Sequence, residues 1–364
     1  MLRKDTTFVI GAGGSHDFGF PLGEGLRNKI TDLLAVDDAN TSINVKDPVI
    51  AAILKDRAIR EAGVNDWTVR LEAYRRAAAT IRAGLPYARS IDGYLEGVRD
   101  LPDVEFLAKL AIATIILRHE AGSSLVPYTQ PAANAADIRA KQVAQLTGSW
   151  HAQLGQILFD GHTRDTVDGV FERASFVIFN YDRCIEEFLV TALQRRFAID
   201  RGRAVKALAR CNIIHPYGQV GAFFPDQPGY VPFGKLDDQQ VLPEVAAGIR
   251  TFTEAMEESI ADAVKDCIAA AETIVFMGFG WLAQNMELLG VGNRVTNATK
   301  VFATTMGMPK GEVDVVSGQM DEILRRRSHS PPYESTPLPS ADFTSENGDC
   351  KALMTNCWLR LTSD

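Results

Sequence analysis

The chain has 364 residues, of which 46% are hydrophobic and 23% are charged, proportions that are typical of a globular protein with a substantial core. Its formal net charge of −8 at pH 7 argues against a general binder of nucleic acid or of anionic membranes, because contact with phosphate groups needs a positive surface. The five cysteines form no C-x-x-C pair, which indicates reduced thiols rather than a disulfide framework or a zinc ribbon.

The apolar segments of the chain predict a cytoplasmic protein that does not span a membrane. The opening MLRKDTTFVIGAGG contains only a short apolar stretch, whereas a secretory signal needs a longer apolar core. The most apolar segment, residues 104–119, is interrupted by Glu105 and Lys109 and is too short to cross a bilayer. We expect it to be a buried helix.

Five apolar runs predict strands that are covered on both faces, because the runs are continuous rather than alternating. They are residues 6–10, 175–179, 212–215 and 273–279, with a weaker fifth at 300–304. Helical patterns separate these runs, for example Leu22, Leu26, Ile30 and Leu33 after the first strand and the apolar series from Phe252 to Cys267 before the fourth. Strands alternating with helices predict an α/β fold, a Rossmann-like doubly wound and mainly parallel sheet.

The gap between the first two predicted strands is too long for one crossover. It holds several helical stretches, including residues 65–85 and 150–159, but no convincing strand. We therefore expect a Rossmann-type core from residues 1–40 and 170–327, with a large helical insertion lobe at 41–169. The stretch from Ser328 to Asp349 is rich in Pro and Ser, so residues 328–364 are predicted to form an irregular C-terminal segment.

The first strand ends in a glycine-rich turn, G-A-G-G-S. Gly11 and Gly13 would let backbone amides approach an anion closely. The usual dinucleotide fingerprint fails here, because its third glycine is replaced by His16 and the nearest acidic residue at the expected distance, Asp32, falls inside the predicted first helix. The alternative is a tight strand-to-helix turn that binds nothing.

Polar or glycine residues also follow the later strands. Asn180 and Asp182 come directly after the second predicted strand, His215 ends the third, and Gly278 and Gly280 follow the apolar part of the fourth. The carboxyl ends of parallel strands share one edge of a sheet, which predicts that these residues converge on one crevice. Structural roles are the alternative: Asp182 as a helix cap, His215 as a buried core histidine, and the glycines as turn residues.

The ordered set G-A-G-x-S, F-N-Y-D, H-P-Y-G and F-M-G-F-G resembles the sirtuin-like family, and in particular the NAD hydrolases of prokaryotic antiviral defence systems. The resemblance extends from Phe8 to about Thr305 and matches the helical insertion poorly. It implies a catalytic set and an NAD-binding set. The catalytic set is Asn180, Asp182 and His215; the binding set is Gly11, Ala12, Gly13, Ser15, Gly278 and Gly280.

The resemblance implies an NAD glycohydrolase that gives nicotinamide and ADP-ribose and acts as an abortive-infection effector. Asn180 would orient a water, Asp182 would hold the ribose or amide, and His215 would accept a proton. Deacylases of the family carry a zinc lobe with two C-x-x-C pairs, which this chain lacks, so NAD is expected as the substrate and no zinc is expected.

Control of such an effector would come from homo-oligomerisation or from a separately encoded partner, such as a hexameric ATPase or helicase. Two other functions stay open. The first is a sensor module that binds NAD or ADP-ribose without catalysis, and the second is an oxidoreductase, which the missing third glycine and missing strand-end acid disfavour. The motifs do not distinguish NAD from NADP.

Overall fold

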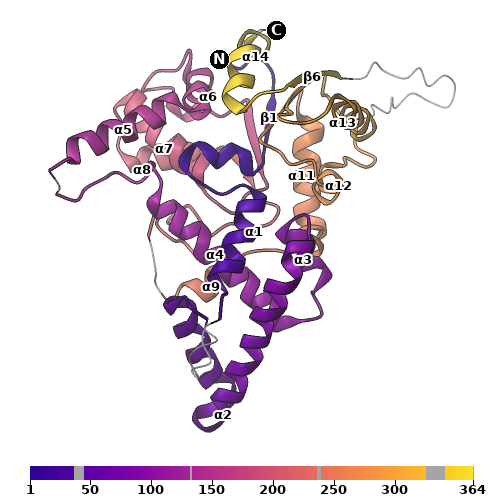
Figure 1. The fold of residues 1–364 in the computed structure, drawn as a ribbon. Helices are drawn as coiled ribbons and strands as arrows, with labels where there is room; N and C mark the ends of the chain where they lie inside the picture. Colours follow the sequence, from indigo (N-terminus) through magenta and orange to yellow (C-terminus); the bar gives the residue numbers. More distant parts are fainter. Residues whose placement is uncertain (37–44, 132, 236–238, 325–340, 364) are drawn as a thin grey trace.

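The computed structural model describes residues 1–36, 45–131, 133–235, 239–324 and 341–363, and its centre is a six-stranded parallel sheet (Figure 1). The strand order is β3-β2-β1-β4-β5-β6, which confirms the predicted Rossmann-like doubly wound arrangement. The strands are β1 (Thr6–Ile10), β2 (Ala174–Ile178), β3 (Asn212–Ile214), β4 (Thr273–Met277), β5 (Lys300–Thr304) and β6 (Asp342–Glu346).

The central strands are apolar because both of their faces are covered. Every residue of β1 and β4 is buried, and the rings of Phe8 and Phe176 stack across the β1–β2 pair with centroids 5.3 Å apart. The predicted strands at 6–10 and 300–304 match β1 and β5. The fourth ends earlier than predicted, at Met277, because Gly278 has a left-handed backbone (φ 59°) that turns the chain out of the sheet.

Helices cover the sheet and fill the long connection between β1 and β2. The α-helices before β2 are α1 (Gly23–Leu33), α2 (Pro48–Gly84), α3 (Ile91–Gly97), α4 (Pro102–Gly122), α5 (Ala135–Gly148) and α6 (Trp150–Phe159). Those after β2 are α7 (Cys184–Phe197), α8 (Arg201–Leu208), α9 (Leu242–Ala247), α10 (Phe252–Ala255), α11 (Glu258–Ala270), α12 (Ala283–Leu289), α13 (Lys310–Ile323) and α14 (Cys350–Thr362). Short 3₁₀ helices lie at η1 (Ala12–Phe18), η2 (Leu85–Tyr87) and η3 (Val167–Gly169).

Two of the predicted helices agree closely with the structure and one does not. The most apolar segment is the buried helix α4, as predicted, and α6 coincides with the predicted stretch at 150–159. The helix expected from Phe252 to Cys267 is instead two helices, because a capping box at Thr251 starts α10 and the chain leaves the helical conformation again at Glu257. Within the described ranges, no helix is long and apolar enough to cross a membrane.

The helical insertion shares the hydrophobic core of the sheet. Buried side chains of α2, α4 and α6 belong to the same apolar cluster as those of β1 and β4, and α6 packs against both α7 and α14. The helix α2 forms the tapered end of the molecule (Figure 1). The insertion is therefore not a lobe with a core of its own.

The prediction of an irregular C-terminal segment is wrong for its second half. Residues 342–346 form β6, which pairs with β5 at the edge of the sheet, and α14 follows it. The strand was missed because its sequence, DFTSE, has no apolar run, since this edge strand is only partly buried. The Asp349 side chain caps α14 by accepting a hydrogen bond from Ala352 N. Residues 328–340 of the predicted segment lie outside the described residues.

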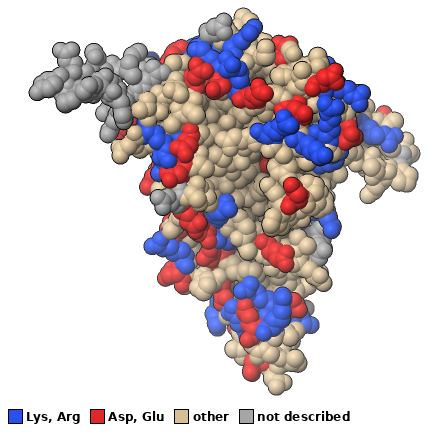
Figure 2. Space-filling model, turned by 180° about the vertical axis from the view of Figure 1, so that it is seen from behind, with Lys and Arg blue, Asp and Glu red and all other residues tan. Residues whose placement is uncertain are grey.

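Charges of both signs are interleaved on the face of the molecule seen in Figure 2, including its tapered end. On α2 the pairs Arg57–Glu61 and Arg60–Asp56 lie at helical i,i+4 spacing with closest distances of 2.7 Å. On the face seen in Figure 2, residues of the tapered end therefore present both signs of charge side by side.

Candidate active site at the strand exits

The sheet topology brings the predicted site residues to one edge. β1 lies between β2 and β4: the chain passes from β1 to β2 and β3 on one side, and then crosses from β3 to β4 on the other side. In open α/β sheets, ligands bind outside the carboxyl ends of the strands at such a switch point. The exits of β1, β2, β3 and β4 all carry residues of the predicted motifs, and hydrogen bonds link these exits to one another.

A hydrogen-bonded chain joins the exits of β1 and β2. Asn180 Nδ2 donates to Gly11 O and to Ser15 Oγ, both at 3.0 Å, and Ser15 Oγ donates to Asp182 Oδ1 at 2.9 Å. The directions are fixed by chemistry, because Gly11 O can only accept and an amide nitrogen can only donate. Both amide hydrogens of Asn180 are used in this way, so the oxygen Oδ1 is the group that this side chain has left for a ligand or a water.

Asp182 belongs to this hydrogen-bonded chain and also forms a turn just before α7. Its Oδ1 accepts a hydrogen bond from Cys184 N at 3.1 Å, as in an Asx-turn. The N-cap residue of α7 is Arg183, and no side chain of the described residues caps the helix, so Asp182 forms a turn but is not the predicted cap. The side chain is buried together with Ser15 and Asn180. Burial raises the pKa of Asp182, and the nearby Glu186 carboxylate acts in the same direction.

His215 lies between two hydrogen-bond acceptors. Its Nε2 is 2.8 Å from Glu186 Oε1 and its Nδ1 is 3.1 Å from Asn180 O. A neutral imidazole has one N–H, whereas a carboxylate and a carbonyl together need two, so the geometry fits the imidazolium form. Burial, the largest single effect, lowers the pKa of His215, but the Glu186 carboxylate, the Asn180 carbonyl and Asp182 together raise it, and the pKa is raised overall.

Glu186 was not predicted from the sequence. It lies in the first turn of α7, where an acidic residue is ordinary because it suits the helix dipole, and no motif marks it. Its side chain is buried, and Oε2 has no hydrogen-bond partner within the described part of the chain. Its position directly behind a strand-end histidine becomes visible only in three dimensions.

The glycines at the exits of β1 and β4 pack against each other. A Cβ on Gly11 would lie 2.5 Å from Gly278 O, and one on Gly13 would lie 2.7 Å from Gly278 Cα. Gly13 N donates to Gly278 O at 3.0 Å. Close contact between two backbone segments therefore explains why glycine is present at positions 11, 13 and 278. This agrees with the alternative interpretation, in which these glycines form a tight turn. Gly280 differs, because it is exposed and a Cβ there would meet nothing within 4 Å.

The helical insertion contributes Glu120, one partner of a buried ion pair, to the site. Glu120 of α4 accepts hydrogen bonds from Arg183 Nε at 3.0 Å and from Arg183 N at 3.2 Å, and both side chains are fully buried. Trp150 of α6 donates from Nε1 to Gly14 O at 2.8 Å, which supports the glycine turn. Neither contact was predicted, because the partners are 63 and 136 residues apart in the chain.

The strand next to β1 does end in an acid. Counting along the chain led to Asp32, which lies inside α1, but the insertion delays the neighbouring strand until residue 174, and the acid at its exit is Asp182. The missing strand-end acid is therefore not an argument against an oxidoreductase. The substitution of the third glycine by His16 remains one.

Comparison with protein-family models, with curated proteins and with solved structures found no match to this chain. Within the described residues, no group of three or more His, Cys, Asp or Glu side chains is placed to hold a metal ion. The five cysteines are free.

Proposed function

We propose that the protein is an NAD glycohydrolase that cleaves the bond between nicotinamide and ribose. The observation that carries the proposal is the buried hydrogen-bonded chain Asn180–Ser15–Asp182 at the switch point of a sheet with the dinucleotide-binding strand order. Buried polar groups at a strand exit are candidates for chemistry because burying them is otherwise costly. The antiviral effector role, the homo-oligomer and the partner ATPase or helicase are part of the same proposal and rest on the sequence resemblance.

The reaction needs few groups. The C1′–N1 bond breaks with its electron pair going to nicotinamide, a water oxygen bonds to C1′, and the water loses one proton. Asn180 Oδ1 would orient that water, Asp182 would hold a ribose hydroxyl, and His215 would take the proton. In the conformation described above both nitrogens of His215 face acceptors. It therefore acts as a base only after it has lost a proton and one of these contacts has opened.

The test is NAD consumption by the purified protein, with nicotinamide and ADP-ribose quantified, at several protein concentrations. Asn180→Ala and His215→Ala are each expected to lower the rate about 100-fold or more, the usual range for loss of a catalytic proton-transfer or orienting group. Asn212→Ala is the matched control, because Asn212 is exposed at the opposite end of β3. Urea unfolding of each variant separates loss of catalysis from loss of the fold. Parent-level hydrolysis by Asn180→Ala would contradict the proposed role.

A sensor that binds NAD or ADP-ribose without cleaving it is the second candidate. It is favoured by the same contacts that restrict His215, since a fully paired imidazolium is suited to binding rather than to proton abstraction. Calorimetric NAD binding without turnover at any protein concentration would select the sensor. Hydride transfer to an added acceptor would instead select an oxidoreductase.

A further inference from the structure

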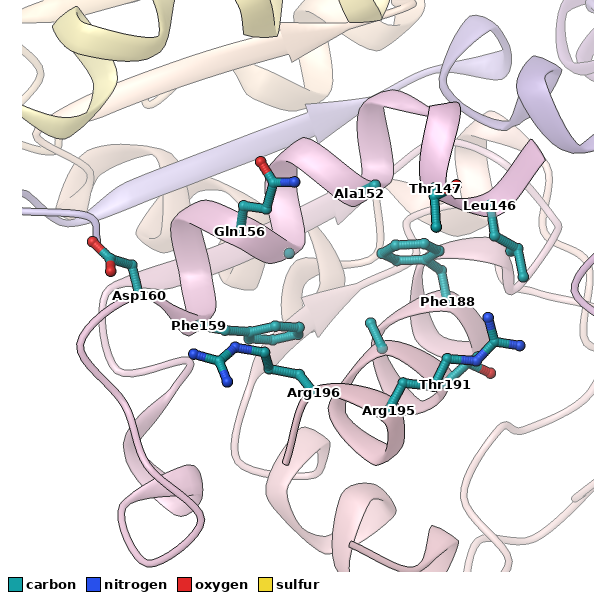
Figure 3. Close-up of a pocket in the computed structure, with 12 residues that line it drawn as sticks. Leu146, Thr147, Ala152, Gln156, Phe159, Asp160, Phe188, Thr191, Arg195 and Arg196 are labelled. Atoms are coloured by element: carbon teal, nitrogen blue, oxygen red, sulfur yellow. The ribbon is translucent and has the colours of Figure 1, made fainter. Parts of the chain in front are cut away.

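An apolar groove lies away from the strand exits, between α6 and α7 (Figure 3). Its volume is about 480 Å³, and its walls include the rings of Phe159 and Phe188 together with Ala152 and Gly155. The size falls within the range of small-molecule sites. A Cβ on Gly155 would lie 3.3 Å from the Phe159 ring and 3.7 Å from the Phe188 ring, so a larger residue at this position would crowd both rings.

Two arginines border this groove. Arg195 and Arg196, in the last turn of α7, are exposed, and neither forms an ion pair with any residue that the structure describes. Figure 3 shows Arg196 beside Phe159 and Arg195 towards the other end of the groove. The acidic lining residue, Asp160, is paired with the amino group of Met1 at 2.9 Å, so it does not neutralise the arginines.

We propose that the groove binds a small amphiphilic anion, with its apolar body between Phe159 and Phe188 and its acidic head on Arg195 or Arg196. Apolar walls favour an alkyl or aromatic body, and a guanidinium pairs with carboxylate or phosphate through two parallel hydrogen bonds. A neutral apolar ligand would form no ion pair with Arg195 or Arg196. The proposal is independent of NAD hydrolysis, because the groove shares no residue with the strand-exit site.

Isothermal titration calorimetry of the full chain with octanoate, octyl phosphate and 1-octanol tests the proposal. We expect one or both anions to bind at one site per chain and 1-octanol to bind at least about 10-fold more weakly, as expected when a charge-assisted hydrogen bond is lost. Binding of octanoate alone assigns a carboxylate ligand, and binding of octyl phosphate alone assigns a phosphate ligand.

Variants of the groove locate the binding. The double variant Arg195→Gln/Arg196→Gln should weaken anion binding about 10-fold or more, and Ala152→Phe should abolish it by filling the groove. The matched control Arg82→Gln/Arg89→Gln makes the same change of charge at exposed positions elsewhere and should leave binding unchanged. Urea unfolding shows that each variant is folded.

Three results would overturn the proposal: equal affinity for 1-octanol and the anions, binding that neither groove variant alters, or no binding of either anion at millimolar concentration. The last result would instead favour a protein segment as the occupant of the groove.

Discussion

The two ends of α7 differ in how their charged groups are satisfied. At the N-terminal end, Asp182 and Glu186 are buried and hydrogen-bonded to Ser15 and His215. At the C-terminal end, the exposed Arg195 and Arg196 border an apolar groove. In the first region the charged groups are hydrogen-bonded within the protein. In the second region an apolar surface and two positive charges are exposed.

Because of this difference, a substitution has different consequences in the two regions. At the strand exits the candidate catalytic side chains Asn180, Asp182 and His215 also make buried hydrogen bonds, so a substitution of any of them changes stability as well as any activity. At the groove the arginines form no ion pair with the described residues, and the contact of Arg196 with the Phe197 ring at 5.4 Å is at an exposed site, so a substitution there reports mainly on binding.

The largest effect is expected from Glu120→Ala. It leaves the Arg183 guanidinium buried without its counter-charge, which typically costs about 3–5 kcal/mol. Asp56→Ala is the control, because Asp56 pairs with Arg60 at an exposed site and should cost less than about 0.5 kcal/mol. The free energy of unfolding in urea measures both. An equal decrease in the free energy of unfolding for the two variants would contradict the expected cost of leaving the Arg183 charge buried without its partner.

The second effect concerns the glycine contact between the exits of β1 and β4. Gly13→Ala should destabilise the protein by about 1–3 kcal/mol, because its Cβ would overlap the Gly278 backbone at 2.7 Å. Gly280→Ala should be nearly neutral in stability, since nothing lies within 4 Å of its Cβ. Thermal unfolding compares the two. If Gly280 contacts NAD, only that variant would lose NAD affinity while keeping its stability.

The third effect is a pH dependence of stability that comes from His215. Its folded pKa is raised above the ordinary histidine value of about 6.5. The His215–Glu186 pair therefore contributes fully below about pH 6.5, and its contribution is lost as the pH rises through the folded pKa. Urea unfolding across this range should show the loss, and Glu186→Gln should flatten it. An unchanged slope in the variant would contradict the pairing.

The same pair makes a prediction for the rate of NAD hydrolysis. If His215 is the base, its neutral form is the active one, so the rate should rise with pH through the raised pKa. Glu186→Gln should lower that pKa and move the acidic limb of the profile to lower pH, because it removes the negative charge. A role for Glu186 in folding alone would leave the limb where it is.

The smallest effect is expected at the other end of α7. Arg195→Gln/Arg196→Gln should change the free energy of unfolding by no more than about 0.5 kcal/mol, because both side chains are exposed and form no ion pair within the described ranges. Urea unfolding measures it. A loss as large as that of Gly13→Ala would mean that the arginines support the fold and are not free for a ligand.

The sequence predicted those features that are encoded within one segment. Continuous apolar runs such as residues 6–10 and 300–304 predicted buried parallel strands. The polar residues Asn180, Asp182 and His215, at or just after the ends of the second and third predicted strands, predicted the edge of the sheet at which the candidate site lies. β6 was missed because an edge strand needs no apolar run. Glu120 and Glu186 were missed because their roles depend on partners brought close only by folding.

The glycine turn shows the same limit. The glycines of the turn predicted that its backbone lies close to another group. Whether that group is a ligand or another part of the protein follows only from the position of Gly278 in the structure. The groove carries no motif at all, since basic residues in the last turn of a helix such as Arg195 and Arg196 are ordinary. The groove is formed jointly by the surfaces of α6 and α7, so no single segment of the sequence predicts it.

The position of β1 at the centre of the sheet has a consequence for synthesis of the chain. β1 is made first, but its neighbours β2 and β4 begin at residues 174 and 273. At about 5–20 residues per second, ribosomes take on the order of ten seconds or more to supply the first of them. During that time the apolar segment 6–10 has no strand to pair with, although all residues of helices α1 to α6 are made before those of β2. Newly made protein should therefore depend on chaperones more strongly than its helix content suggests.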